Sequence, residues 1–242
     1  MARGPRLMRF DVLTIFPAVF PGPLGIGVVG RALDSGSVEL HVHDLRAHTI
    51  DRHRQVDDMQ FGGAGGMVLK PEPIVRAVRA LRDEVATLRT ILLSPQGRVF
   101  NQDVAHELSR ERAVLLVCGR YQGVDERARE EIGEELSVGD YVLSGGEVGA
   151  MAVIEATARL LPGVVGSPES LDQETFSSSV GGGLEPPLYT RPAEFEGHEV
   201  PAVLRNGDHA AITAWRRQQS EQSTRRRRPD LVRLRAVPGG NK

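Results

Sequence analysis

The chain has 242 residues, of which 40% are hydrophobic and 26% charged, and this composition suits a globular protein of one or two domains. A formal net charge of −2 gives no overall attraction to nucleic acid, so any site for a polyanion must be local. Cys118 is the single cysteine, which excludes an intramolecular disulfide and a cysteine-based zinc site. No apolar run approaches the roughly 20 residues of a membrane span, and the N-terminus lacks the apolar core of a signal peptide, so we expect a cytoplasmic location.

The first segments of the chain predict two strands with a helix between them. Residues 10–15 and 38–42 alternate and are rich in strand-forming side chains. The segment 25–30 matches the Gly-x-Gly-x-x-Gly fingerprint of dinucleotide sites, but a proline-rich loop separates it from the first strand. Because the fingerprint requires a direct turn from strand to helix, we interpret this segment as the start of a helix that ends near Gly36.

A long polar loop is predicted over residues 51–67. Charged residues and glycines dominate the segment, and this composition does not favour a packed element. Long loops inside compact domains are often functional, whereas a solvated, mobile surface loop explains the composition equally well.

A helix over 71–83 is followed by three repeats of strand, loop and helix. The strands are the apolar segments at 90–93, at 113–117 and leading to the Gly145-Gly146 pair, and the following helices begin after Asn101, near Asp125 and after the glycine pair. Strands without alternation are typical of a parallel sheet in an α/β domain, where ligands bind at the carboxyl ends of strands. We therefore expect the three loops to converge on one pocket, although the glycine pair alone fits a tight turn without a ligand.

The composition changes after Pro162, where the third helix is expected to stop. Glycine, serine and proline are frequent as far as about Arg191, which is typical of a flexible linker, and this stretch carries an acidic string. Beyond it, Asp208 is placed to cap a helix. The arginines at 225–228 fit a surface that contacts phosphates and a solvated basic tail equally well.

Short motifs spread over nearly the whole chain occur in one order. They lie at 51–54, 56–58, 93–97, 117–121, 124–127, 139–147, 189–192, 207–210 and 215–216. In this ordered set the chain resembles the bacterial tRNA (guanosine(37)-N1)-methyltransferases of the SPOUT superfamily. The resemblance implies an α/β fold of the SPOUT type, with a parallel sheet, a C-terminal deep trefoil knot in the first domain and a small, mainly helical C-terminal domain.

The resemblance also implies a division of labour along the chain. Residues 1–165 would bind S-adenosyl-L-methionine, 166–175 would form a flexible linker, and 176–242 would bind tRNA. The protein would be a homodimer whose active sites are each shared between the cofactor loops of one subunit and the C-terminal domain of the other. The methyl group would pass to N1 of guanosine 37, next to the anticodon. The cofactor-binding residues that the resemblance implies are Leu93, Ser94, Pro95, Gly119, Tyr121, Val138, Gly139, Asp140, Tyr141, Val142, Leu143, Gly145 and Gly146.

The implied chemistry needs a general base, because guanine N1 carries a proton at neutral pH. The family's catalytic aspartate lies in a linker motif that ends in Ser-Phe, and counting back from Phe176 puts Glu174 at its position, with Asp172 as the competing candidate. Arg159 matches the active-site arginine and would stabilise negative charge near O6.

Two further implications concern metal and the range of functions. The family's activity leans on Mg²⁺, and Gln122 replaces a family glutamate, which removes one carboxylate near the site. A tRNA-binding relative without catalysis, and a methyltransferase of the same fold with another RNA target, are the alternative functions.

Overall fold

The computed structural model describes residues 7–63 and 65–236. The chain divides into two units, the first ending at Gly166 and the second beginning at Ser167. Among the helices described, none is both long enough and apolar enough to cross a membrane.

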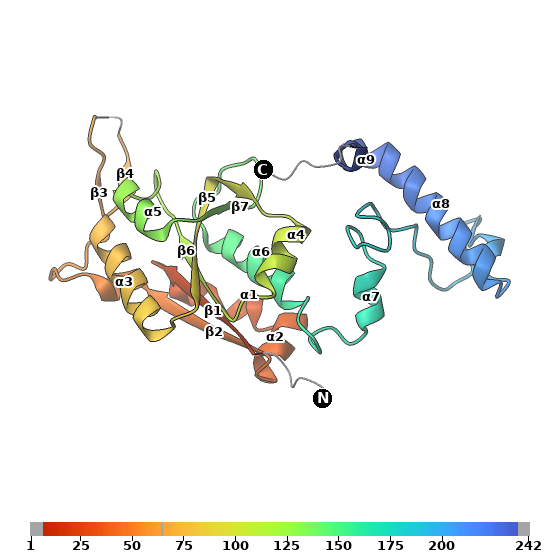
Figure 1. The fold of residues 1–242 in the computed structure, drawn as a ribbon, viewed down its shortest axis with the longest axis horizontal. Helices are drawn as coiled ribbons and strands as arrows, with labels where there is room; N and C mark the ends of the chain where they lie inside the picture. The colour runs from red at the N-terminus through yellow and green to blue at the C-terminus, as the bar shows by residue number, and fades with distance from the viewer. Residues whose placement is uncertain (1–6, 64, 237–242) are drawn as a thin grey trace. The chain divides into compact units, whose positions relative to one another are not determined.

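A five-stranded parallel sheet forms the centre of the first unit (Figure 1). Its strand order is β2-β1-β6-β5-β7. The strands are β1 (Met8–Thr14), β2 (Val38–Asp44), β5 (Leu88–Val99), β6 (Ala113–Cys118) and β7 (Glu135–Ser137). The predicted α/β class with a parallel sheet is confirmed.

Helices pack on both faces of this sheet. One hydrophobic core includes side chains of α1 (Pro21–Leu24), α2 (Gly27–Asp34), α4 (Gln102–Leu108) and α6 (Glu147–Ala158), and the other includes α3 (Pro71–Glu84), α5 (Glu126–Ile132) and the 3-10 turn η2 (Leu45–His48). Successive residues of a strand point to opposite faces, so Leu116 of β6 joins the first core and Leu115 the second. Every residue of β6 is buried, which explains its apolar sequence without alternation.

The segment between β1 and α2 agrees with the rejection of a dinucleotide fingerprint. The 3-10 turn η1 (Pro17–Val19) and helix α1 stand between them, so the direct turn that the fingerprint requires is missing. Helix α2 ends at Asp34, close to the predicted end.

The prediction of a loop without packed elements over 51–67 is wrong. Strands β3 (Asp57–Met59) and β4 (Met67–Leu69) pair as an antiparallel hairpin. The hairpin also bonds to a backbone segment that is distant in sequence. The N–H of Leu69 donates to the carbonyl of Gly123 at 3.0 Å, and the N–H of Gln122 donates to the carbonyl of Met67 at 3.0 Å. The composition could not reveal backbone partners contributed by another loop.

Two other element boundaries differ from the prediction. Residues 94–97, expected as a turn, lie inside β5, where its pairing with β7 shifts register between Leu93 and Arg98. The third strand, β7, ends at Ser137, and the apolar residues after it form a loop in which Val142 is 84% exposed. Their apolar character therefore does not come from burial in the sheet.

The second unit is built around one long helix. It contains α7 (Pro168–Asp172), a short β8 (Glu194–Phe195) and β9 (His198–Glu199) pair, η3 (Ala202–Leu204), α8 (His209–Arg227) and α9 (Pro229–Ala236). Asp208 caps α8 as predicted, because its carboxylate accepts hydrogen bonds from the N–H groups of Ala210 and Ala211 at 3.0 Å. The segment expected to be a linker contains α7, and the arginines at 225–227 form the last turn of α8.

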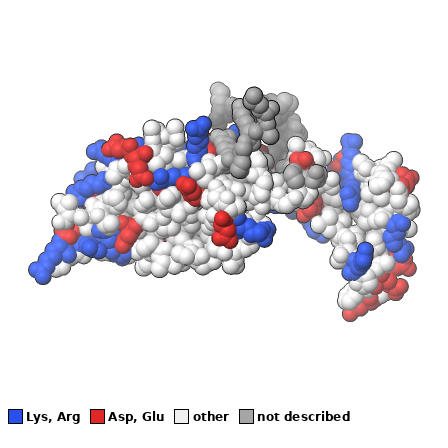
Figure 2. Space-filling model, turned by 90° about the horizontal axis from the view of Figure 1, so that it is seen from below, with Lys and Arg blue, Asp and Glu red and all other residues white. Residues whose placement is uncertain are grey.

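Charged side chains of both signs are interspersed on the face shown in Figure 2. This agrees with the near-neutral net charge and indicates that any site for a polyanion depends on local groups of basic side chains.

Candidate functional site

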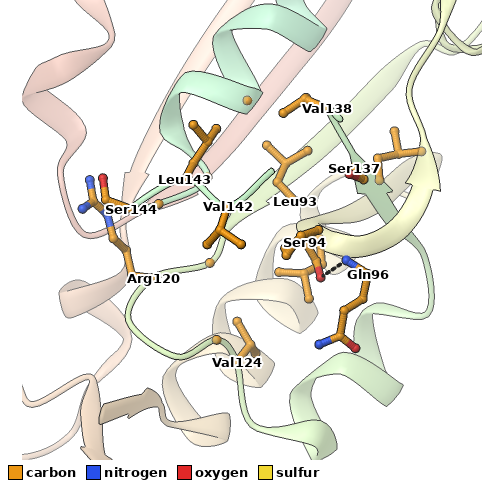
Figure 3. Close-up of a pocket in the computed structure, with 18 of the residues that line it drawn as sticks. Leu93, Ser94, Gln96, Arg120, Val124, Ser137, Val138, Val142, Leu143 and Ser144 are labelled. Carbon is orange, nitrogen blue, oxygen red and sulfur yellow. Dashed lines mark hydrogen bonds between the residues drawn. The ribbon is translucent and has the colours of Figure 1, made fainter. Parts of the chain in front are cut away.

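One pocket in the first unit is lined by residues 92–96, at the register shift within β5, and by the loops that follow β6 and β7. Figure 3 shows Leu93 of β5 together with Val138 and Val142 of the loop that follows β7 around this space. Such a position is where open parallel sheets bind ligands. Of the cofactor-binding residues that the resemblance implied, all except Asp140 line the pocket, namely Leu93, Ser94, Pro95, Gly119, Tyr121, Val138, Gly139, Tyr141, Val142, Leu143, Gly145 and Gly146.

The Gly145-Gly146 pair lets the third loop, which follows β7, lie against the second loop, which follows β6. The N–H of Gly146 donates to the carbonyl of Gly119 at 2.9 Å. A Cβ atom on Gly146 would come within 2.8 Å of the Cα of Cys118, and one on Gly145 within 2.1 Å of the Arg120 Nε. The glycines are therefore required by the close approach of two protein loops, which an approach to a ligand alone would not explain.

The loop from Val138 to Leu143 is held by its own hydrogen bonds. Gly139 has a φ of 149°, a value that favours glycine. The Tyr141 N–H donates to the carbonyl of Gly139 at 2.9 Å, and the Tyr141 hydroxyl donates to that of Val138 at 3.0 Å. The Ser137 hydroxyl donates to Gly139 O at 3.0 Å. These bonds fix the backbone of the loop while leaving the Val142 side chain exposed to the pocket.

A buried carboxylate stabilises the loops through hydrogen bonds. Glu147 is 3% exposed and accepts hydrogen bonds from the Thr14 hydroxyl at 2.7 Å and the Arg120 Nε at 3.1 Å. The Arg120 guanidinium also lies 4.6 Å from the centre of the Phe16 ring, a cation–π contact. This network joins β1, the second loop and α6. The part of Thr14 in it was not predicted, because no local sequence pattern indicates it.

Cys118 has a structural role at the end of β6. Burial raises the pKa of its thiol well above the ordinary value, with a smaller contribution from the charge of Glu147. A thiol in this state is a poor nucleophile.

The two predicted catalytic residues belong to different units. Arg159 follows the last residue of α6 and is its C-cap. It is not among the residues that line the pocket. Glu174 lies in the second unit, shortly after α7, and Asp172 is the last residue of that helix.

Among the described residues, no group of three or more His, Cys, Asp or Glu side chains is arranged so that it could hold a metal ion. Gln122 lies on the pocket with its side chain against Gly66 of the β3–β4 hairpin, where a Cβ atom would come within 2.7 Å of it.

Comparison with known proteins identifies the family. The family model described as tRNA (Guanine-1)-methyltransferase TrmD matches residues 8–234. Curated relatives named tRNA (guanine-N(1)-)-methyltransferase include those of Geobacter metallireducens, 49% identical over 93% of this chain and 91% of the relative, and Dictyoglomus turgidum, 49% identical over 93% and 90%. The relative from Chloroflexus aurantiacus is 50% identical over 96% of this chain and 91% of its own length. The chain therefore belongs to the tRNA (Guanine-1)-methyltransferase TrmD family.

Proposed function

We propose that this protein transfers the methyl group of S-adenosyl-L-methionine to N1 of guanosine 37 in tRNA. Membership of the family supports methyl transfer to guanine N1 of tRNA. The structural observation that carries the proposal is the pocket formed by residues 92–96 of β5 and by the loops that follow β6 and β7. Because the substrate is tRNA, we place the reaction in the cytoplasm.

The lining of the pocket suits an adenosine. Leu93, Val138 and Val142 provide apolar surface for a flat ring, and the loops bring backbone N–H and C=O groups near it. When bound, S-adenosyl-L-methionine supplies a methyl group activated by the sulfonium. The hydrogen bonds of Tyr141 fix the conformation of the third loop before the cofactor binds, which reduces the conformational entropy lost when it binds.

We assign the three loops to a deep trefoil knot of the SPOUT type and propose that the protein works as a homodimer. In this arrangement each active site is shared between the cofactor loops of one subunit and the C-terminal domain of the other. Residues 166–175 would connect the domains, and 176–242 would bind tRNA. The target guanine must leave its stack to reach the methyl group, as is usual for enzymes that modify a base.

Two side chains of this chain would serve the methyl transfer, one as a general base and one by stabilising negative charge. The carboxylate of Glu174 accepts the proton that leaves guanine N1. The guanidinium of Arg159 stabilises the negative charge that develops toward O6.

The proposal is tested in two steps. Titration calorimetry should detect binding of S-adenosyl-L-methionine, and methyl transfer should be observed to a tRNA with guanosine at position 37 but not to the same tRNA with adenosine there. Absence of cofactor binding would favour a tRNA-binding protein without catalysis. Equal transfer to both tRNAs would favour another RNA target.

A further inference from the structure

Helix α8 buries two hydroxyl side chains. Ser220 is 6% exposed and Thr224 is 3% exposed, and in the described part of the chain these are the buried residues of the helix. A surface helix ordinarily buries apolar side chains. Buried hydroxyls need hydrogen-bond partners, so this face of α8 is specified by what the hydroxyls bind.

Both hydroxyls bind the backbone of one residue, Leu184. The Ser220 hydroxyl donates to the carbonyl of Leu184 at 2.6 Å, and the N–H of Leu184 donates to the Thr224 hydroxyl oxygen at 2.9 Å. The Thr224 hydroxyl itself donates to the carbonyl of Ser220 at 2.8 Å. The donor and the acceptor of Leu184 are therefore both satisfied by α8 side chains, and the chain at this point is fixed along the helix.

The residues on either side of Leu184 hold the segment that follows Glu174. The N–H of Phe176 donates to the carbonyl of Gly183 at 2.7 Å, and the N–H of Glu185 donates to the Thr175 hydroxyl oxygen at 3.2 Å. The hydrogen bonds therefore run without interruption from the backbone next to Glu174, through residues 183–185, to Ser220 and Thr224.

We propose that Ser220 and Thr224 are positioning residues for the general base. They fix the segment that carries Glu174 to α8, whose last turn carries Arg225, Arg226 and Arg227. A tRNA that docks on this helix would then place the carboxylate at the same time. The inference rests on the proposed role of Glu174, and it has a physical basis in the steep dependence of proton transfer on geometry: a misplacement of about 1 Å can cost on the order of 100-fold in rate.

Three variants of the full-length protein separate positioning from simple stabilisation. Thr224→Val keeps the shape of the side chain and removes the partner of the Leu184 N–H, whereas Thr224→Ser retains the hydroxyl. Thr213→Val is the matched control, because Thr213 lies on the same helix, is exposed, and bonds only within it, to the carbonyl of His209 at 2.8 Å. All three carry helix propensities close to that of threonine.

For Thr224→Val we expect kcat for tRNA methylation to fall about tenfold or more, with the Kd of S-adenosyl-L-methionine and the KM for tRNA within about twofold of wild type. Thr224→Ser should restore most of kcat, and Thr213→Val should match wild type. Amide hydrogen exchange over 174–185 should accelerate in Thr224→Val alone. If Thr224→Val does not fold, Ser220→Ala, which removes only the partner of the Leu184 carbonyl, should lower kcat with the same selectivity.

The outcomes distinguish this inference from the function on which it rests. A wild-type protein that methylates tRNA, together with a Thr224→Val protein of unchanged kcat, would overturn the positioning role alone. The same conclusion follows if Thr224→Ser fails to restore kcat, or if faster exchange over 174–185 leaves kcat unchanged. A wild-type protein that methylates no tRNA would overturn the proposed function, and the positioning role with it.

Discussion

Glu174 and Asp172 compete at the residue scale for the role of general base. We expect Glu174→Gln to lower methyl transfer by about 10²- to 10⁴-fold, because the amide keeps the shape of the side chain but cannot accept the proton. The Kd of S-adenosyl-L-methionine should stay unchanged, since the pocket is lined by residues of the first unit. Single-turnover methylation and calorimetry measure the two quantities.

Asp172→Asn is the matched control for this prediction. Asp172 supports the same segment through its backbone, whose carbonyl accepts hydrogen bonds from the hydroxyls of Ser177 and Ser179, and the substitution leaves these bonds in place. Its effect on methyl transfer should be mild. A large loss in Asp172→Asn with a small loss in Glu174→Gln would reassign the base.

A second residue-scale prediction concerns Gly146. Its φ of −75° is accessible to any residue, so Gly146→Ala tests space rather than backbone strain. The added Cβ would meet the Cα of Cys118 at 2.8 Å and the backbone N of Gly119 at 3.1 Å, and backbone atoms cannot move aside as a flexible side chain can. We expect the third loop to shift and the Kd of S-adenosyl-L-methionine to rise about tenfold, in line with overpacking costs of about 1–3 kcal/mol.

Gly166→Ala is the control, because a Cβ there would meet nothing within 4 Å. Calorimetry of both variants measures the effect. An unchanged Kd in Gly146→Ala would show that the contact between the two loops does not shape the pocket.

At the scale of elements, local signals were sufficient where the interaction itself is local. Asn101 and Asp208 were predicted as helix caps, and both accept hydrogen bonds from N–H groups in the first turn. The β3–β4 hairpin escaped prediction because its outer partners are contributed by residues 122–125. Similarly, Thr14 at the end of β1 and Glu147 at the start of α6 are brought together over a sequence separation of 133, which no local pattern indicates.

The same limit applies to the candidate site. The order of apolar strands predicted that three segments would meet, because parallel strands share an edge, and residues of all three line the pocket. The first of them, 94–97, lies within β5 and is not the loop that was predicted. The roles of Glu174 and Arg159 came from the family resemblance alone. Nothing in their spacing specifies a base or an arginine near O6, since those roles depend on where the substrate lies.

Strand β1 carries a buried charge whose titration can be followed. Asp11 is fully buried and accepts hydrogen bonds from the Arg9 Nε at 2.7 Å, with His43 Nε2 also at 2.7 Å. Burial alone would raise the pKa of Asp11, but the hydrogen bonds of His43 and Arg9 outweigh it and lower the pKa below 3.8. Asp11 therefore stabilises the fold above pH 3.8, and this contribution is lost as pH falls through its folded-state pKa.

His48, on η2, titrates in a separate window. Burial lowers its pKa below 6.5, and the nearby charge of His43 adds to the shift. The unfolded chain then binds the proton more readily, so the free energy of unfolding should decrease as pH falls from 6.5 toward the folded-state pKa of His48.

Urea unfolding between pH 3 and 8 measures both windows. Asp11→Asn should lower the free energy of unfolding at pH 7 by about 1–3 kcal/mol, because it weakens a buried hydrogen-bonded network, and should remove the loss below pH 3.8. His48→Gln should remove only the loss below pH 6.5. An Asp11→Asn protein with the wild-type acid dependence would mean that another carboxylate governs that window.

At the scale of the whole molecule, binding of a polyanion has to overcome a formal net charge of −2. Lys and Arg side chains are interspersed with Asp and Glu on the surface shown in Figure 2. The last turn of α8 concentrates three arginines, Arg225, Arg226 and Arg227, all exposed. The next arginine differs from them, because the Nη2 of Arg228 lies 2.7 Å from Asp230 Oδ2 and its charge is already paired.

Neutralising the last turn of α8 should therefore weaken tRNA binding and reduce its dependence on salt. Each arginine that contacts a phosphate releases bound counterions, and losing one such contact flattens the slope of log K against log salt by about 0.7–0.9. We expect Arg225→Gln, Arg226→Gln and Arg227→Gln combined to lower the slope by up to about 2 to 3, measured by filter binding between about 50 and 200 mM salt. Arg31→Gln, at an exposed arginine on α2, is the control and should keep the wild-type slope. A triple variant with an unchanged slope would identify the turn as a solvated basic surface, and the phosphate contacts would then have to lie elsewhere on the molecule.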